Sequence, residues 1–540
     1  MLKKRGRRVL ALALCVCVAW LCAGQVFAAG EPAPDPPSKF YRWGYNLTDT
    51  LLMGAVGAVG KLFPEPRWPS AKTYTNPHFF AGTTPFLQAP AANAAWRLGY
   101  ASESLLTEDL LDGKHFVGGS LAVNEAKTVT AVLDDLRVRT VAVNDGSGRG
   151  TVVFAALDAY GLANTAVNAI RAQLMDFAAQ EGIVSLNLSA LHQHSAVDTF
   201  GMNGDIWQVL LKNPIANLLH PNQPLYNGQN PAYMAHLAAA TQKAVRDAVQ
   251  NMTPGKLYYG TTDVEDFIWD RRAPFVNDTS MARFRFAPTD GSTETWLCTS
   301  MIHCVGNGAA GREVTGDYPY FVEQQIGEKA NFMLLMGAQQ SNSMQRGTQN
   351  LPSLKEGMSG YETLELFGRA LGDKLLGVLN ETEVEPLLNL RHAQVQVPIS
   401  NQILLVGGKN GMFTNQVVKT RRGYRVATEI GYMELGSDLA FALVPGELAP
   451  ELAYGGCLQA DKSWSGKDWT LPSLQELVAQ TGSKRTLRVL GLTNDQIGYI
   501  VPDNNYMPVL APEGQSVEFV SCGAQTASTL VTAFEALIGA

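Results

Sequence analysis

The chain of 540 residues is 46% hydrophobic and 17% charged, and its 42 basic and 49 acidic residues give a net charge of −7. This length and composition are typical of a large globular protein that can bury its own core. The acidic balance argues against nucleic acid as a partner, because proteins that bind phosphate backbones concentrate basic residues.

Residues 1–28 have the pattern of a secretory signal peptide. Five basic residues precede an apolar run from Val9 to about Leu21, and Val26-Phe27-Ala28 follows as a small-residue exit. The run is too short to span a membrane comfortably, and no later segment reaches ~18 uninterrupted apolar residues. We therefore expect cleavage and export, so that the mature protein is secreted, periplasmic or otherwise extracellular. Removing five of the 42 basic residues leaves 37 against 49 acidic ones.

Two segments follow the signal peptide. Residues 29–39 include four prolines and predict an extended tether. The next segment, 41–63, is apolar and rich in small residues, which predicts a helix buried in the fold. The alternative is a surface patch in peripheral contact with a membrane. No long linker interrupts residues 40–540, so we expect one large catalytic domain there.

Helical and strand patterns alternate through this domain. The segments 163–179, 233–252 and 360–380 predict helices, and apolar runs of strand length separate them. This alternation is typical of an α/β protein, so we expect mixed sheets flanked by helices. Ligands of such proteins bind at the carboxyl ends of strands.

The cysteines and the common hydrolase motifs narrow the chemistry. Four cysteines lie outside the signal peptide, and their even number permits disulfides, with the pairing left open: Cys298, Cys304, Cys457 and Cys522. None forms a Cys-x-x-Cys pair, which disfavours a cysteine-rich structural zinc site. Neither a Gly-x-Ser-x-Gly elbow nor a His-Glu-x-x-His helix occurs, which disfavours the hydrolases that carry those motifs.

The first candidate site follows the apolar run 182–188. The run alternates apolar and polar residues, which predicts a strand, and it leads into His192-Gln193-His194. Side chains two residues apart on a strand share a face, so both rings could contact one metal ion or one substrate. Imidazole is a common nitrogen ligand of Zn²⁺. The alternative interpretation is two polar residues at a strand end.

Three more strand-like segments end in polar groups suited to a metal or to acid–base chemistry. The segment 296–303 ends in His303 and precedes a glycine-rich loop, 438–447 presents Glu447 after Pro-Gly, and 486–499 reaches Tyr499. If the carboxyl ends of these strands meet, the side chains converge. Taken singly, each has a structural alternative: a hydrogen-bonded histidine, a helix-capping glutamate and a packed tyrosine. The other histidines have no partner at ligand spacing and are assigned to the surface or the core: His78, His115, His220, His236 and His392.

In this order, the segments resemble the motifs of the neutral and alkaline non-lysosomal ceramidase family. The family's Thr-His-Thr-His-Ser-Gly-Pro motif aligns with residues 191–197, and its Pro-Gly-Glu motif is retained at 445–447. The similarity covers about residues 80–540 and includes residues 157–161, but no C-terminal immunoglobulin-like domain. It implies a ceramidase-like zinc hydrolase domain in which four residues bind Zn²⁺, namely His192, His303, Glu447 and Tyr499.

The catalytic residues that the resemblance implies are His194 and Ser343. His194 lies beside the first ligand, and an imidazole of ordinary pKa could pass a proton to a leaving amine. Ser343 aligns with the family's catalytic serine and could orient the substrate or act as nucleophile. Its setting differs, because Ser341 and Met344 stand where the family has aspartate and proline. The reaction type therefore transfers better than the substrate.

The resemblance implies an exported hydrolase that cleaves the amide bond of ceramide or a related N-acyl lipid with a zinc-activated water. Two alternatives remain open. The scaffold could bind a lipid or cell-envelope ligand without turnover, or the same site could cleave esters. The oligomeric state is left open as well.

Overall fold

The computed structural model describes residues 38–119, 128–205, 207–220, 223–306, 311–345, 358–511 and 515–539. The predicted signal peptide, and the predicted tether up to residue 37, lie outside these ranges. None of the helices in the described part of the chain combines the length and apolarity needed to cross a membrane.

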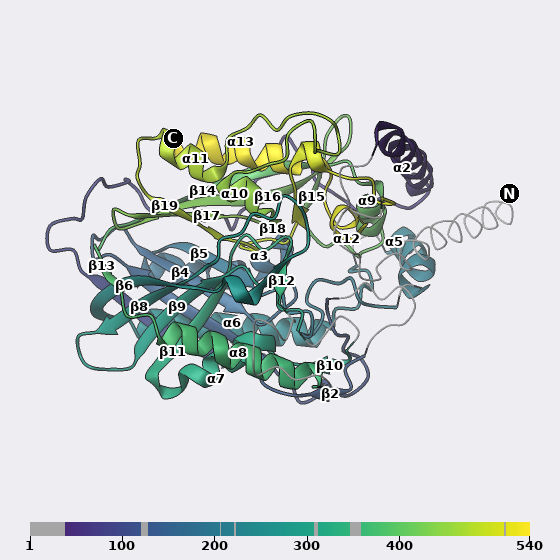
Figure 1. Cartoon of the computed structure of the whole chain (residues 1–540). Helices are drawn as coiled ribbons and strands as arrows, with labels where there is room; N and C mark the ends of the chain where they lie inside the picture. Colours follow the sequence, from purple (N-terminus) through teal and green to yellow (C-terminus); the bar gives the residue numbers. More distant parts are fainter. Residues whose placement is uncertain are drawn as a thin grey trace.

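Two large mixed sheets pack face to face at the centre of the molecule (Figure 1). The first has nine strands, in the order β11 (Ala330–Met336), β9 (Glu294–Ser300), β8 (Ser280–Pro288), β6 (Thr253–Asp263), β1 (Trp96–Ser104), β3 (Arg137–Asn144), β4 (Thr151–Leu157) and β5 (Ile183–Ala190), with β13 (Thr382–Val384) paired to β6. The second has five, in the order β14 (Leu388–Ile399), β16 (Tyr424–Leu435), β17 (Leu439–Leu443) and β19 (Thr486–Leu490), with β15 (Val417–Lys419) paired to β16.

Three two-stranded pairings lie outside the large sheets. They are β2 (Ala131–Val132) with β10 (Glu313–Val314), β7 (Ile268–Asp270) with β12 (Asn342–Met344), and β18 (Glu447–Leu448) with β20 (Tyr499–Ile500). Two of these, β7–β12 and β18–β20, hold residues of the predicted site.

Helices cover the outer face of each large sheet, giving four layers (Figure 1). Over the second sheet lie α10 (Pro450–Tyr454), α11 (Leu474–Gln480) and α13 (Thr526–Ile538). The first sheet is covered by α3 (Asn164–Ala172), α4 (Met175–Glu181), α6 (Pro231–Gln250), α7 (Asp317–Ile326) and α8 (Gly360–Leu376). The prediction of an α/β domain with mixed sheets flanked by helices is confirmed.

The remaining helices are short or lie at one end of the molecule. The end that holds α2 (Lys39–Gly60) also holds α5 (Asn213–Leu219), α9 (Gln402–Lys409) and α12 (Gln515–Phe519) (Figure 1). The single-turn elements are η1 (Gln208–Lys212), η2 (Glu265–Phe267), η3 (Gly327–Lys329) and η4 (Asp503–Asn505). No immunoglobulin-like sandwich occurs among the described residues beyond Tyr499.

Two expectations about helices need correction. The predicted helix 163–179 is divided into α3 and α4, because Gln173 and Leu174 leave the helical path between them. The segment 41–63 does form a helix, but the prediction that it is buried is wrong for most of its length, since only Val56 and Gly60 of α2 are buried.

Both faces of the central strands are buried, which explains their nearly continuous apolar sequences. In β4, Val152, Phe154 and Ala156 face the second sheet. Their neighbours Val153 and Ala155 pack with the outer helices. The four cysteines outside the signal peptide are free thiols, so disulfides do not contribute to this core.

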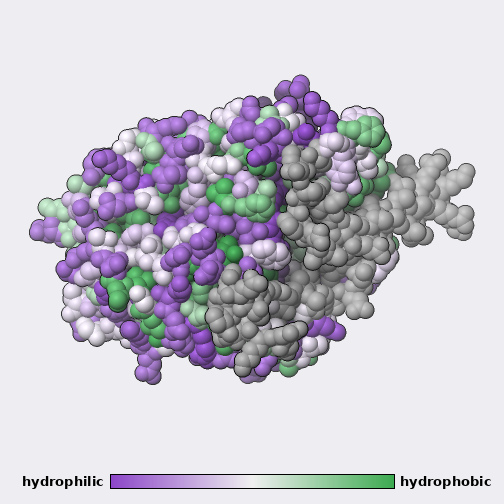
Figure 2. Space-filling view, in the orientation of Figure 1, coloured by the Kyte–Doolittle hydropathy of each residue, from purple (hydrophilic) through white to green (hydrophobic). Residues whose placement is uncertain are grey.

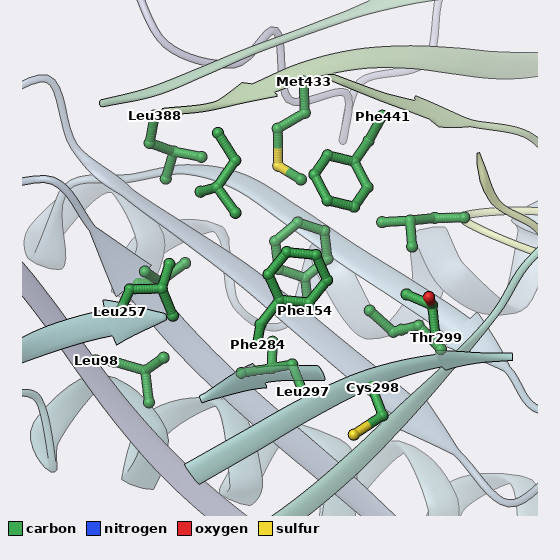
Figure 3. A pocket seen from close by; sticks show the side chains of 14 residues that line it. Leu98, Phe154, Leu257, Phe284, Leu297, Cys298, Thr299, Leu388, Met433 and Phe441 are labelled. Carbon is green, nitrogen blue, oxygen red and sulfur yellow. The ribbon is translucent and has the colours of Figure 1, made fainter. Parts of the chain in front are cut away.

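Aromatic and aliphatic side chains fill the space between the two sheets. Phe154 and Phe284 of the first sheet point toward Met433 and Phe441 of the second, around a cavity of about 60 Å³ (Figure 3). Apart from Thr299, the side chains around this cavity are apolar. It is a packing void in the core, too small for a lipid chain.

Replacing Phe154 by alanine is expected to lower the free energy of unfolding by about 3–5 kcal/mol, because it enlarges this void between the sheets. Denaturant unfolding of the variant measures the change. Leu379→Ala is the matched control, since Leu379 is 87% exposed, and its expected change is within about 0.5 kcal/mol. Equal stability of the two variants would contradict this account of the core.

Candidate functional site

Hydrogen bonds bring the four predicted strand ends together. The loop after β19 is joined to β5, because Asn494 N donates to Leu188 O at 2.7 Å and Leu188 N donates back to Asn494 Oδ1 at 2.9 Å. β18 and β20 run parallel, with Glu447 opposite Tyr499. The two histidine loops meet where His194 N donates to Cys304 O at 3.0 Å.

His192 lies just beyond the strand rather than on it. β5 ends at Ala190, and His192 has a φ of +58°, in the left-handed region that side chains other than glycine rarely occupy. Such backbone strain costs of order 1–3 kcal/mol and is found mostly at functional sites. The prediction that His192 and His194 share a strand face is therefore wrong in its geometry. Their ring centroids still lie 4.8 Å apart, because the loop turns both inward.

The loop that carries His192 is anchored by the segment 157–161. Gln193 Nε2 donates to Asp158 Oδ1 at 3.1 Å and to Gly316 O at 2.6 Å. The Tyr160 ring stacks on the His192 imidazole with centroids 4.7 Å apart. His192 Nδ1 lies 2.8 Å from the Tyr160 carbonyl oxygen. A carbonyl only accepts, so Nδ1 carries the proton and Nε2 is left to face the site.

His303 is held in the same manner. It lies three residues beyond β9, and its Nδ1 donates to Asn342 O at 2.8 Å. Its backbone N–H donates to the same carbonyl at 3.0 Å. Its Nε2 therefore points the other way, to Glu447 Oε2 at 2.7 Å.

Glu447 is the carboxylate on which both imidazoles converge. It is 2% exposed, and its Oε2 lies 3.4 Å from His192 Nε2. Gln496 Nε2 donates to Oε1 at 3.2 Å. Burial would raise the pKa of the Glu447 carboxyl, but His192 and His303 outweigh burial and hold the pKa below its usual value. Glu447 is thus ionised at neutral pH.

Tyr499 completes the group from the neighbouring strand. Its phenol hydrogen-bonds to Glu447, and burial followed by the Glu447 charge raises its pKa well above the ordinary value. In the absence of a cation this phenol is protonated at neutral pH.

The donor set fits a divalent metal ion. Burial lowers the pKa of His192 below its ordinary value, so this ring is neutral and its Nε2 lone pair faces a carboxylate. Among the described residues, His192 Nε2 has no hydrogen-bond partner. A neutral imidazole lone pair that faces an ionised carboxylate is unfavourable unless a cation binds to both. Histidines whose other nitrogen donates to a backbone carbonyl are typical of metal sites, and nitrogen with oxygen suits zinc.

His194 belongs to the same cluster. One of its ring nitrogens lies within 4.8 Å of a ring nitrogen of His192 and of His303, so distance alone permits it as a ligand. Burial, followed by the two neighbouring imidazoles, holds the pKa of His194 well below its ordinary value. The sequence-based expectation of an ordinary pKa is therefore wrong. His194 is neutral, and it must accept a proton before it can donate one.

Ser343 lies on β12, next to Asn342, whose carbonyl oxygen accepts from His303 Nδ1. β12 pairs with β7, placing Ser343 opposite Trp269, and Gln340 N donates to Leu448 O at 3.3 Å. The segment thus runs between His303 and Glu447. The Ser343 hydroxyl is buried and has no hydrogen-bond partner within the described ranges.

Sequence reasoning missed three contributors to the site. Tyr160 lies in the segment 157–161, which resembles the family but by itself indicates no chemical role. Gln496 could not be recognised, because a single glutamine is uninformative. Burial is the largest influence on both groups, since it lowers the pKa of His194 and raises that of Tyr499. The Arg271 guanidinium acts on both groups as well, and it lowers each pKa. Arg271 therefore adds a positive charge at the edge of the site.

A cluster of one histidine and two aspartates lies apart from this site. His115 is buried with Nδ1 3.4 Å from Asp112 and Nε2 3.8 Å from Asp109. His115 is buried, which agrees with its assignment to the surface or core. The sequence did not predict its two carboxylate neighbours. The Lys114 ammonium pairs with Asp112 at 2.8 Å and would compete with a cation there.

Comparisons with known proteins identify the fold. No protein-family model matches the sequence, and no curated protein matches it. The structure is similar to neutral ceramidase from Pseudomonas aeruginosa, with a TM-score of 0.60 and 14% identity over 82% of this chain and 74% of that one. A ceramidase complexed with C2 matches with a TM-score of 0.59 and 12% identity over the same shares. The chain therefore has a ceramidase-like fold.

Proposed function

We propose that this protein is an exported zinc-dependent amidohydrolase that cleaves the amide bond of ceramide or a related N-acyl lipid. The observation that carries the proposal is the pair of imidazoles, each fixed by a backbone carbonyl, whose Nε2 atoms face the single buried carboxylate Glu447. The ceramidase-like fold supports the choice of reaction and substrate class. Export is proposed from the pattern of residues 1–28.

Four residues would hold the ion: His192, His303, Glu447 and Tyr499. When bound, zinc supplies a Lewis acid that polarises a carbonyl and makes water nucleophilic near neutral pH. Of the four ligands, Tyr499 depends most on the ion. Burial and the Glu447 charge keep its phenol protonated, and the phenol becomes a better ligand only when a cation offsets that charge.

The remaining side chains would move protons and stabilise charge. His194 is neutral, so it can accept the proton that the attacking water loses and pass it to the leaving amine. Arg271 adds a positive charge that favours negative charge on the substrate carbonyl oxygen. Ser343 is proposed to orient the substrate, since its buried hydroxyl is free to donate.

A second candidate is a ceramidase-like scaffold that binds a lipid without turnover. The observation in its favour is the changed setting of Ser343, with Ser341 and Met344 on either side of the expected turn. An esterase on the same site is a variant of the first proposal.

A substrate panel tests the proposal. The purified protein is incubated with ceramides, N-acyl amino acids and matched esters, before and after zinc is removed with a chelator and restored. Mass spectrometry is expected to show free fatty acid and free amine released from an amide substrate. These products should form only when zinc is present. Products from the esters alone would establish the esterase instead. Saturable lipid binding with no product from any member would support the second candidate.

A further inference from the structure

Exposed hydrophobic side chains are concentrated at one end of the molecule. Of the fourteen large ones exposed in the described part of the chain, ten lie on α2 and its C-terminal extension or on η1–α5. Figure 2 shows hydrophobic atoms on the surface where α2 lies. Scattered single residues need no explanation, but a contiguous set marks an interaction surface.

The first stripe follows one face of α2. Phe40, Trp43, Leu47 and Leu51 recur every three or four residues and are 80%, 59%, 44% and 66% exposed. This spacing places them on a single helical face. The opposite face packs against α9 through Val56.

The second stripe begins at Trp207, the residue before η1, and continues along η1 and α5. Trp207, Leu211, Ile215 and Leu218 are 48%, 42%, 61% and 71% exposed. The two stripes are neighbours, because Asn217 Nδ2 donates to Pro64 O at 3.1 Å just beyond α2. The buried sides of both segments also share one hydrophobic cluster. We call the two stripes together the apolar face.

The exposed charges on the two segments are basic. Lys39, Lys61 and Lys212 are exposed. The one acidic residue within 39–62 is Asp49, whose carboxylate accepts from Val509 N at 3.0 Å. Residues 207–220 contain no acidic residue. A hydrophobic surface with aromatic residues and a lysine rim complements anionic lipid headgroups.

Buried packing contacts run from the residues under the apolar face to the residues around the site. Val520 packs both against the cluster under α2 and against a small cluster that includes Phe200. The Phe200 ring contacts that of Tyr160, which stacks on His192. On the other side, Gly498, next to Tyr499, lies directly against the Val520 backbone. A short series of packing contacts therefore connects the face with the site.

We propose that the apolar face docks the protein onto the surface of a bilayer containing anionic lipid. A second copy fits less well, because a two-fold interface would set the lysines of one copy against those of the other. The inference deepens the proposed function in one respect, since it makes the bilayer the source of the N-acyl substrate. Docking itself does not depend on catalysis.

Co-sedimentation with vesicles tests the docking. The purified protein is mixed with phosphatidylcholine vesicles with and without phosphatidylglycerol, at low and high salt. We expect binding that phosphatidylglycerol strengthens and salt weakens. Leu51→Glu and Leu218→Glu are each expected to weaken binding roughly tenfold or more. Leu379→Glu is the matched control, because Leu379 is 87% exposed outside the face, and it is expected to bind like the wild type.

Three outcomes would overturn the proposal: no binding of the wild type to either vesicle, binding unchanged in the double variant L51E/L218E, or equal loss in the Leu379 control. Self-association without lipid that L51E/L218E abolishes would assign the face to a second copy. Hydrolysis of a soluble short-chain N-acyl amide distinguishes a failure of docking from a failure of the proposed function. L51E/L218E should retain that activity, and vesicle binding by a wild type that hydrolyses nothing would refute only the proposed function.

Discussion

Replacing Glu447 by glutamine is expected to lower kcat/KM for an N-acyl substrate by about 10³-fold or more and to remove bound zinc. The amide keeps the size of the side chain but loses the charge on which His192 and His303 converge. Without that charge, the ion would lose the one carboxylate among its four proposed ligands, leaving His192, His303 and the protonated phenol of Tyr499. Steady-state kinetics and metal analysis of the same preparation measure both effects.

Glu451→Gln is the matched control for this variant. Glu451 is also buried, and burial raises its pKa to about 7, but it is not among the groups that contact the two imidazoles. Its variant is expected to keep its zinc and nearly all its activity. Wild-type activity in the Glu447 variant would refute the assignment of the site.

Replacing His194 by glutamine is expected to reduce kcat by about 10²- to 10⁴-fold while the bound zinc remains. The reason is that His194 is assigned to proton transfer, although one of its nitrogens lies within 4.8 Å of a ring nitrogen of His192 and of His303. The pH profile should also change, since the variant lacks the imidazole that accepts the proton. Kinetics across pH and zinc titration separate the two roles.

His392→Gln provides the comparison for His194. His392 is a buried histidine of β14 that hydrogen-bonds to Ser185 Oγ at 3.1 Å, away from the cluster. Its variant should retain kcat and the pH profile. A large fall in zinc affinity on replacing His194 would make it a ligand and return proton transfer to another group.

The sequence carried the segments of the site but not their geometry. The strand ends at His192, His303, Glu447 and Tyr499 could be located because apolar runs and glycine-containing turns are local signals. That His192 adopts a left-handed backbone conformation is not a local preference, since the Tyr160 and Asp158 contacts enforce it. The structure shows these four residues together, and their role as zinc ligands stays a prediction.

Long-range contacts explain the other differences. The low pKa of His194 depends on burial among residues far away in the sequence. Arg271 reaches the site only because β7 pairs with β12. The apolar composition of 41–63 indicated burial, yet the hydrophobic face of α2 that includes Phe40 and Trp43 is exposed. Composition alone does not distinguish a helix packed in a core from one that meets another surface.

The zinc content of the purified protein is the most direct test of the proposed function, because every proposed catalytic role depends on an ion held by His192, His303 and Glu447. Mass-spectrometric metal analysis, followed by calorimetric titration of chelator-treated protein with zinc, is expected to show about one zinc ion per chain, bound at a site that Glu447→Gln eliminates. A protein that is purified without metal and binds no added zinc would contradict it.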